Sequence, residues 1–257
     1  MPDPQLVLGA LRTSQQRLAG LIDRVGAGEF ERPSYDQGWS VADVLSHLGS
    51  QAEIFTCFVD AGLQGTAPPS NDSFGPIWDR WNAKSPGDKV ADSLSADAAF
   101  LDLWDTVSAD QLNTFELDLF GMEVDAARLL GMRLGEHALH SWDVAVAFDD
   151  EALLAPDATE LVLDALGALV PRVGRPESDP ATVSVVASSP DRRFILDTAG
   201  VSLEPGDAPA GSPRIELSAE ALVRLVYGRL DDRHPGVPEP TATGIDLDRL
   251  RAVFPGL

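Results

Sequence analysis

The sequence predicts an α+β protein of two domains, a helical domain over residues 1–174 and a small mixed domain over residues 175–257. Two observations support this fold class. Long segments with apolar residues at helical spacing fill the chain as far as residue 173, whereas short runs rich in β-branched residues begin after residue 180. Between them, residues 174–180 are rich in Gly, Pro and charged side chains, a composition typical of a linker between domains.

Within the first domain, the apolar periodicity predicts four long helices and one more before the linker. The second helix begins with a capping box, because the side chain of Ser40 is followed three residues later by Asp43. The residues between the second helix and Pro76 are rich in Gly and Pro and predict a long loop. Four helices joined by loops are typical of an antiparallel bundle, whose facing side chains often build metal sites. The predicted helices cover residues 4–25, 40–62, 88–107, 123–148 and 156–173.

The second domain alternates short strands with helices. We expect a small, antiparallel sheet, since the β-branched runs are brief and separated by turn residues. The predicted strands cover residues 181–187, 193–197, 201–204 and 215–217. A helix capped by Ser218 is expected as far as Gly228, and a last helix over residues 247–254.

Charge and cysteine content narrow the class of protein. A formal net charge of −22 repels phosphates, so neither nucleic acid nor an anionic membrane is expected as a partner. The single cysteine, Cys57, excludes an intrachain disulfide framework and fits a reducing compartment. Since the sequence shows neither a signal peptide nor an apolar run of membrane-spanning length, we expect a cytoplasmic protein. We expect it to be a monomer or a homodimer. Nearly all its cations are Arg, which favours a high-GC bacterial source.

The most informative pattern is a cluster of potential metal ligands on the longest predicted helix. Glu136 and His140 are four residues apart, so they share a helix face and can converge on one ion. His137 is an alternative partner of His140, since residues three apart also share a face. His47, two turns into its own helix, is the best third ligand, and three such ligands leave the open position typical of catalytic zinc. The competing interpretation is that these are ordinary, partly buried histidines.

Several other side chains have weaker assignments. Asp143 is three residues beyond His140 and is placed to orient that imidazole ring, or else to bond elsewhere in the bundle. Cys57 lies about 80° around its helix from His47, which predicts a core residue and not a nucleophile. The tryptophans are expected in the core and lining a pocket: Trp39, Trp78, Trp81 and Trp142.

Three segments, in order and suitably separated, resemble the mycothiol-dependent maleylpyruvate isomerase family. They are Trp-Ser-Val-Ala-Asp-Val-Leu-Ser-His-Leu at 39–48, Glu-x-x-x-His followed by Trp-Asp at 136–143, and Arg-Leu-Val-Tyr-Gly-Arg at 224–229. The resemblance covers nearly the whole chain. It implies a DinB-like metal-binding four-helix bundle and a small α+β domain similar in shape to sterol-carrier proteins. It also selects Glu136 over His137.

The resemblance further implies how such a site would work. Zinc, or a similar divalent ion, would be held by His47, Glu136 and His140, with the thiol of mycothiol in the open position. A bound dication stabilises a thiolate at neutral pH, and the thiolate attacks an electrophilic carbon. The family implies an actinobacterial mycothiol S-transferase or a cis-trans isomerase, with Arg229 as catalytic and cofactor-binding residue and Arg224 as a second cofactor-binding candidate. The alternatives are a noncatalytic metal- or ligand-binding protein and a metal-assisted hydrolase.

Overall fold

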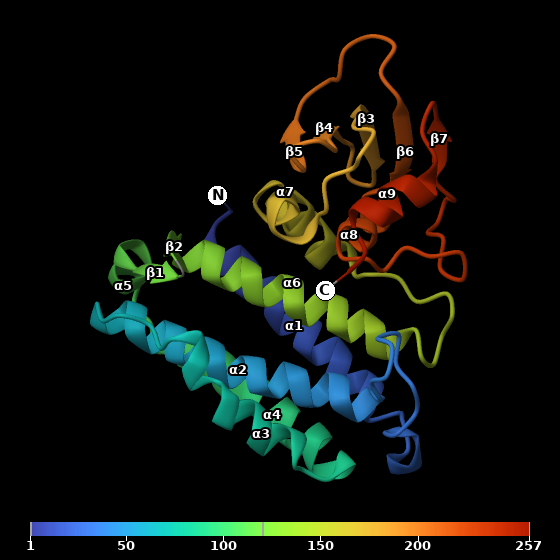
Figure 1. Cartoon of the computed structure of the whole chain (residues 1–257). Helices are drawn as coiled ribbons and strands as arrows, with labels where there is room; N and C mark the ends of the chain where they lie inside the picture. Colours follow the sequence, from blue (N-terminus) through green and yellow to red (C-terminus); the bar gives the residue numbers. More distant parts are fainter. Residues whose placement is uncertain (1, 120, 257) are drawn as a thin grey trace. The chain divides into compact units, whose positions relative to one another are not determined.

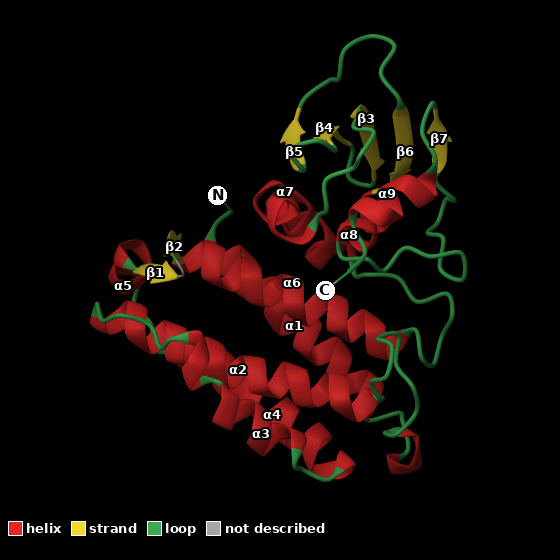
Figure 2. Ribbon diagram, viewed as in Figure 1, coloured by secondary structure: helices red, strands yellow, loops and turns green. Residues whose placement is uncertain are grey.

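The computed structural model describes residues 2–119 and 121–256 and divides into two compact units, Met1–Ala152 and Leu153–Leu257. The first unit is helical apart from one short hairpin, and the second contains a five-stranded sheet with helices (Figures 1 and 2). The predicted fold class, a helical N-terminal part followed by a mixed C-terminal part, is therefore confirmed.

Four long helices build the first unit, and all four were predicted to within a few residues. Helix α2 packs along α4 and α6, and α1 packs along α6 and α4, so that one apolar core lies among them (Figure 1). Leu18, Leu45, Val90 and Val144 each come from a different one of these helices and meet in that core. No helix in the described part of the chain is long and apolar enough to cross a membrane. The bounds are α1 Pro4–Ile22, α2 Val41–Gln64, α4 Pro86–Asp105 and α6 Ala126–Ala145.

The two helices that carry the candidate ligands have strong N-terminal caps. The Ser40 side chain accepts from the backbone N–H of Asp43 at 3.2 Å, and Asp43 Oδ2 accepts from the N–H of Ser40 at 3.0 Å, so the predicted capping box is present. Asp125 caps α6 by accepting from the N–H of Arg128 at 2.8 Å. Helix α2 ends at Gln64 and is capped by Gly65, whose φ of 62° is one that glycine adopts without strain.

Short elements lie mostly in segments for which the sequence predicted neither helix nor strand. Helix α3 begins where the predicted loop ends, and the first residues predicted for the fourth helix form a strand instead. Helix α3 is short, but it packs closely on α2, because a Cβ on Gly49 would lie 2.2 Å from the Trp81 ring. A short helix that is stabilised by such a tertiary contact is not evident from the apolar periodicity of the local sequence. These elements are α3 Gly75–Asn82, α5 Ala109–Thr114, and the antiparallel hairpin β1 Glu116–Leu119 with β2 Met122–Asp125.

The second unit has a sheet of strand order β5-β4-β3-β6-β7, with three helices along one of its faces (Figure 2). Alternate residues of β3 are buried, as expected for a sheet covered on one side. The expectation of an antiparallel sheet is wrong for one pair: β3 and β6 are parallel, because the chain completes β4 and β5 before it returns. Strand β7 was not predicted, since it is three residues long and exposed. The bounds are β3 Thr182–Ser188, β4 Arg192–Asp197, β5 Ser202–Pro205, β6 Arg214–Ser218, β7 Thr241–Thr243, α7 Pro156–Val173, α8 Ala219–Val226 and α9 Leu247–Val253.

Helix α7 belongs to the second unit. It packs on α8 and on β5, so the division between the units falls between Ala152 and Leu153. The sequence predicted the boundary after this helix, at residues 174–175. The difference arises because the periodicity of an amphipathic helix shows which of its faces is buried but not which core receives that face.

Candidate metal centre

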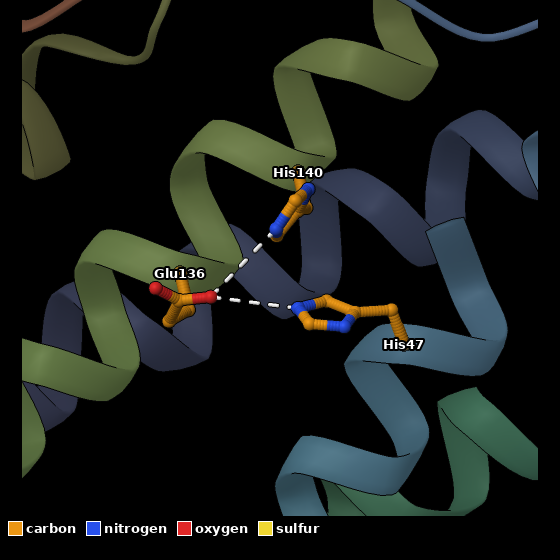
Figure 3. Close-up of side chains that lie close together, drawn as sticks. All are labelled: His47, Glu136 and His140. Carbon is orange, nitrogen blue, oxygen red and sulfur yellow. Dashed lines mark ion pairs between the residues drawn. The ribbon is translucent and has the colours of Figure 1, made fainter. Parts of the chain in front are cut away.

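His47, Glu136 and His140 lie together between helices α2 and α6. His47 comes from the second turn of α2, and Glu136 and His140 from successive turns of α6 (Figure 3). Glu136 Oε2 lies 3.5 Å from His47 Nε2 and 3.7 Å from His140 Nε2, and both rings direct these nitrogens at the carboxylate. The ligand atoms of all three side chains lie within 4.8 Å of one another.

This geometry fits a divalent metal ion. Two imidazole nitrogens and one carboxylate oxygen form the donor set of several catalytic zinc sites. Bonds of about 2.1 Å to a tetrahedral ion would place the ligand atoms about 3.4 Å apart, and the two separations from Glu136 are 3.5 and 3.7 Å. Each side chain is partly exposed, with 14 to 28% of its surface accessible. An exogenous ligand can therefore reach the point at which they converge.

Glu136 and His47 have, at neutral pH, the ionisation states that metal binding requires. Burial acts to raise the pKa of Glu136, but the hydrogen bond with His47 and the charges of His140, His47 and Arg133 outweigh it and lower that pKa to about 2. The pKa of His47 is lowered, mainly by burial, which outweighs its contact with Glu136. Metal ligands must be deprotonated, so an ionised Glu136 and a neutral His47 need no further proton loss.

Two carboxylates lie against the other nitrogen of His140. His140 Nδ1 lies 2.8 Å from Asp143 Oδ2 and 3.4 Å from Asp36 Oδ2. Asp143 is fully buried on the next turn of α6, and Asp36 comes from the loop before α2. A carboxylate at Nδ1 fixes the ring orientation and leaves Nε2 for a metal. Asp143 was anticipated in this position, whereas nothing in the sequence marked Asp36.

An aromatic side chain borders the candidate ligands. The Trp39 ring is stacked on His140 with centroids 6.4 Å apart, and its centroid lies 5.4 Å from that of His47. Trp39 is 38% exposed, while Trp81 and Trp142 are buried and Trp78 is exposed. Of the four tryptophans that were expected in the core or lining a pocket, Trp39 is the one beside the metal centre.

His137 lies elsewhere, in a buried polar cluster. Its Nδ1 is 2.9 Å from Ser14 Oγ, and its Nε2 is 3.3 Å from Asp97 Oδ2. All three residues are at most 5% exposed, so no substrate could reach the Ser14 hydroxyl, and the Ser, His and Asp combination serves packing. The geometry brings Glu136, and not His137, to the Nε2 of His140.

Arg133 connects this buried cluster to the candidate metal centre. Its guanidinium donates to Asp97 on α4 and, at 3.0 Å, to the backbone carbonyl of Leu48 on α2. Leu48 directly follows His47, so this hydrogen bond holds α2 against α6 where the ligands face each other. The sequence contains an indication of this buried ion pair, because Asp97 lies on the apolar stripe of its helix, between Leu94 and Leu101. A charge at such a position requires a buried partner.

Comparison with known proteins places this fold in a family. A family model described as the mycothiol maleylpyruvate isomerase N-terminal domain matches residues 11–145, more than half of the chain. The chain belongs to this family. The matched segment includes the three candidate ligands, and the resemblance that three short motifs indicated is confirmed.

Solved structures of the mycothiol-dependent maleylpyruvate isomerase extend the likeness to both units. One is 18% identical with a TM-score of 0.68, and a histidine-to-alanine mutant is 17% identical with a TM-score of 0.67. Each match covers 94% of this chain and 93% of the other. At this identity the likeness shows a shared fold. No curated protein matches the sequence.

The two arginines that the family resemblance suggested both lie in the second unit. Arg224 is 1% exposed, and its guanidinium binds both carboxylate oxygens of Glu220, at 2.6 and 3.1 Å, and the carbonyls of Arg229 and His234. These contacts account for its burial. Arg229 follows helix α8 and donates to the carbonyl of Tyr227 at 2.8 Å. The binding roles of both residues stay predictions.

Cys57 lacks the environment of a reactive thiol. It is partly buried on α2, and burial together with the charges of Asp60 and Glu53 raises its pKa. A raised pKa keeps the thiol protonated at neutral pH, where only the thiolate is an effective nucleophile. If this protein catalyses a reaction that needs a thiolate, a cofactor would have to supply that thiolate.

Proposed function

We propose that this protein is a metal-dependent enzyme that uses mycothiol as its thiol cofactor, acting as a mycothiol S-transferase or as a cis-trans isomerase of the maleylpyruvate type. The observation that supports the proposal most is the convergence of His47, Glu136 and His140 from two helices. Membership of the mycothiol maleylpyruvate isomerase family supports the choice of thiol.

In this proposal the protein side chains hold and orient the reacting groups. His47 Nε2, Glu136 Oε2 and His140 Nε2 hold zinc or a similar divalent ion, while Asp143 and Asp36 fix the His140 ring. When bound, the ion supplies Lewis acidity that keeps a thiol with an ordinary pKa near 8.5 in its thiolate form at neutral pH. Cys57, with its raised pKa, takes no part.

The thiolate then reacts with an electrophilic carbon of the second substrate. In an isomerase, sulfur forms a bond to one carbon of a conjugated double bond, and the π electron pair moves onto the adjoining carbonyl. Rotation about the resulting single bond follows, after which the carbon–sulfur bond breaks and the double bond returns. In a transferase the carbon–sulfur bond persists, and the enolate carbon takes a proton from solvent to give the addition product.

Arg229 is the proposed binding group for an anionic portion of the cofactor or substrate. A protein with a net charge of −22 repels a carboxylate-bearing molecule, so a local cation is needed to hold one. A guanidinium can bind a carboxylate through two parallel hydrogen bonds, which also fixes its orientation. Arg224 is the second candidate, although its guanidinium donates to Glu220 and two backbone carbonyls.

The experiment uses protein in which cobalt(II) replaces the native metal. Adding mycothiol should give an absorption change characteristic of thiolate bound to cobalt, and the loaded protein should consume maleylpyruvate or another activated electrophile only when the thiol is present. Cys57→Ser should behave as the wild type. An unchanged spectrum together with water-dependent ester or amide cleavage would instead identify a hydrolase. An unchanged spectrum without any reaction would indicate a noncatalytic binding protein.

A further inference from the structure

Gln51 has an unusual environment inside the candidate metal centre. It lies one turn after His47 on α2, and its side-chain Nε2 is 3.0 Å from both His47 Nε2 and Glu136 Oε2. Its other amide atom, Oε1, is buried and has no hydrogen-bond partner among the described residues. Gln51 therefore contacts the same two atoms that would bind the metal. The sequence did not predict a site role for Gln51, although the spacing of four residues from His47 puts both side chains on one helix face.

The orientation of the amide follows from its partners. A carboxylate oxygen can only accept a hydrogen bond, so the atom 3.0 Å from Glu136 Oε2 is the NH₂ nitrogen. A bound metal would take the single lone pair of His47 Nε2 that this NH₂ group now contacts, whereas Glu136 Oε2 keeps a second lone pair that one N–H can still use. The other N–H cannot face a cation, so it needs another acceptor within reach of the candidate metal centre.

We propose that Gln51 is a thiol-binding residue, which donates an amide N–H to the sulfur of the thiol that occupies the open coordination position. The inference rests on the proposed function, which supplies that thiol. The sulfur is the one new anionic acceptor that loading the site brings within reach of the amide. A hydrogen bond to an anionic acceptor is roughly twice as strong as one between neutral groups, so Gln51 favours a thiolate over a neutral ligand.

The test compares Gln51→Met with the wild type in the cobalt(II) form. Methionine matches the length of glutamine but has no N–H. Gln64→Met is the matched control, because Gln64 is the exposed last residue of the same helix. Three quantities are measured: the affinity for cobalt by competition with a chelator, and the dissociation constants of 2-mercaptoethanol and of imidazole from the cobalt spectrum. 2-Mercaptoethanol binds as an anion, whereas imidazole binds as a neutral ligand.

We expect Gln51→Met to bind 2-mercaptoethanol about tenfold more weakly, as loss of one hydrogen bond to a charged group predicts. Its affinities for imidazole and cobalt should stay within about threefold, and Gln64→Met should match the wild type. Equal weakening of both ligands would mean that Gln51 only supports the fold, and unchanged thiol binding would show that the amide faces elsewhere. Loss of cobalt affinity would make the amide a metal ligand. Each of these results overturns the inference. If thiol leaves the wild-type spectrum unchanged, the proposed function fails with it.

Discussion

The Nδ1 atom of His140 lies 2.8 Å from Asp143 Oδ2, one turn further along helix α6. Asp143 is fully buried, and its own backbone carbonyl accepts from the N–H of Tyr35 at 3.2 Å. A ring held at Nδ1 by a fixed carboxylate can present only Nε2 to a metal. Glu136, His140 and Asp143 thus lie together on a single helix as two candidate ligands and the group that orients one of them, and α2 adds the third candidate, His47.

Replacing Asp143 with Asn should weaken metal binding without abolishing it. The amide keeps the size of the carboxylate but loses its charge, and loss of such an orienting partner typically lowers metal affinity about 10- to 100-fold. Chelator competition measures this directly. Asp150→Asn, at an exposed position after the same helix, is the control and should leave the affinity unchanged. Wild-type affinity in the Asp143→Asn variant would mean that Asp36 alone orients the ring.

His47→Ala and His137→Ala should have opposite effects on metal content. His47 is the candidate ligand contributed by α2, so its loss would leave two protein ligands, and most of the metal should disappear from the purified protein. His137 faces Ser14 and Asp97 in the core, so its removal should lower stability while metal content stays near one equivalent. Elemental analysis measures the metal content of both purified variants and so tests this ligand set. Full metal content in His47→Ala would exclude this ligand set.

The sequence predicted the long helices well, and it indicated the candidate ligand pair on α6 for the same reason. Apolar periodicity and caps are local features, and so is the spacing of Glu136 and His140 on one helix. His47 could be proposed as the third ligand from its place two turns into its own helix, but its approach to the other two depends on how α2 packs against α6, which no local pattern specifies.

The features that were missed depend on tertiary contacts. The hairpin β1–β2 and helix α3 are too short for a periodic signal, and the parallel pairing of β3 with β6 depends on a crossover. Asp36 approaches His140 from a loop whose course the sequence does not specify. Arg133 and Asp97 left a trace, two opposite charges on apolar helix faces, but pairing them requires knowing that α4 and α6 are close in space.

Asp97→Asn should destabilise the protein strongly at neutral pH. Asp97 and Arg133 are both almost fully buried, and removing one charge of a buried pair costs about 3 to 5 kcal/mol because the other is left uncompensated. Urea unfolding of metal-free protein at pH 7 measures the loss. Asp92→Asn on the same helix is the control. Its surface ion pair with Lys84 should contribute no more than about 1 kcal/mol.

The same variant should change how stability depends on pH. Burial acts to raise the pKa of Asp97, but Arg133 and His137 outweigh it and lower that pKa in the folded protein. A carboxyl with a lowered folded pKa stabilises the fold above its unfolded pKa of about 3.9, and this contribution is lost as the pH falls toward the folded value. The free energy of unfolding should therefore fall less steeply below about pH 4 in Asp97→Asn than in the wild type. Equal slopes would contradict the lowered pKa.

Arg229→Ala and Arg224→Ala should separate a binding role from a structural one. Arg224→Ala leaves the Glu220 carboxylate buried without its partner, so a loss of about 3 to 5 kcal/mol in stability is expected. Arg229→Ala removes the proposed clamp for an anionic group, and kcat/KM for a carboxylate-bearing substrate should fall about 10- to 100-fold, at unchanged metal content. Arg229→Lys should recover part of that loss, because it restores the charge but not the paired donors. If Arg229→Ala instead unfolds as readily as Arg224→Ala, its hydrogen bond to the Tyr227 carbonyl serves the fold, and the clamp must be sought elsewhere.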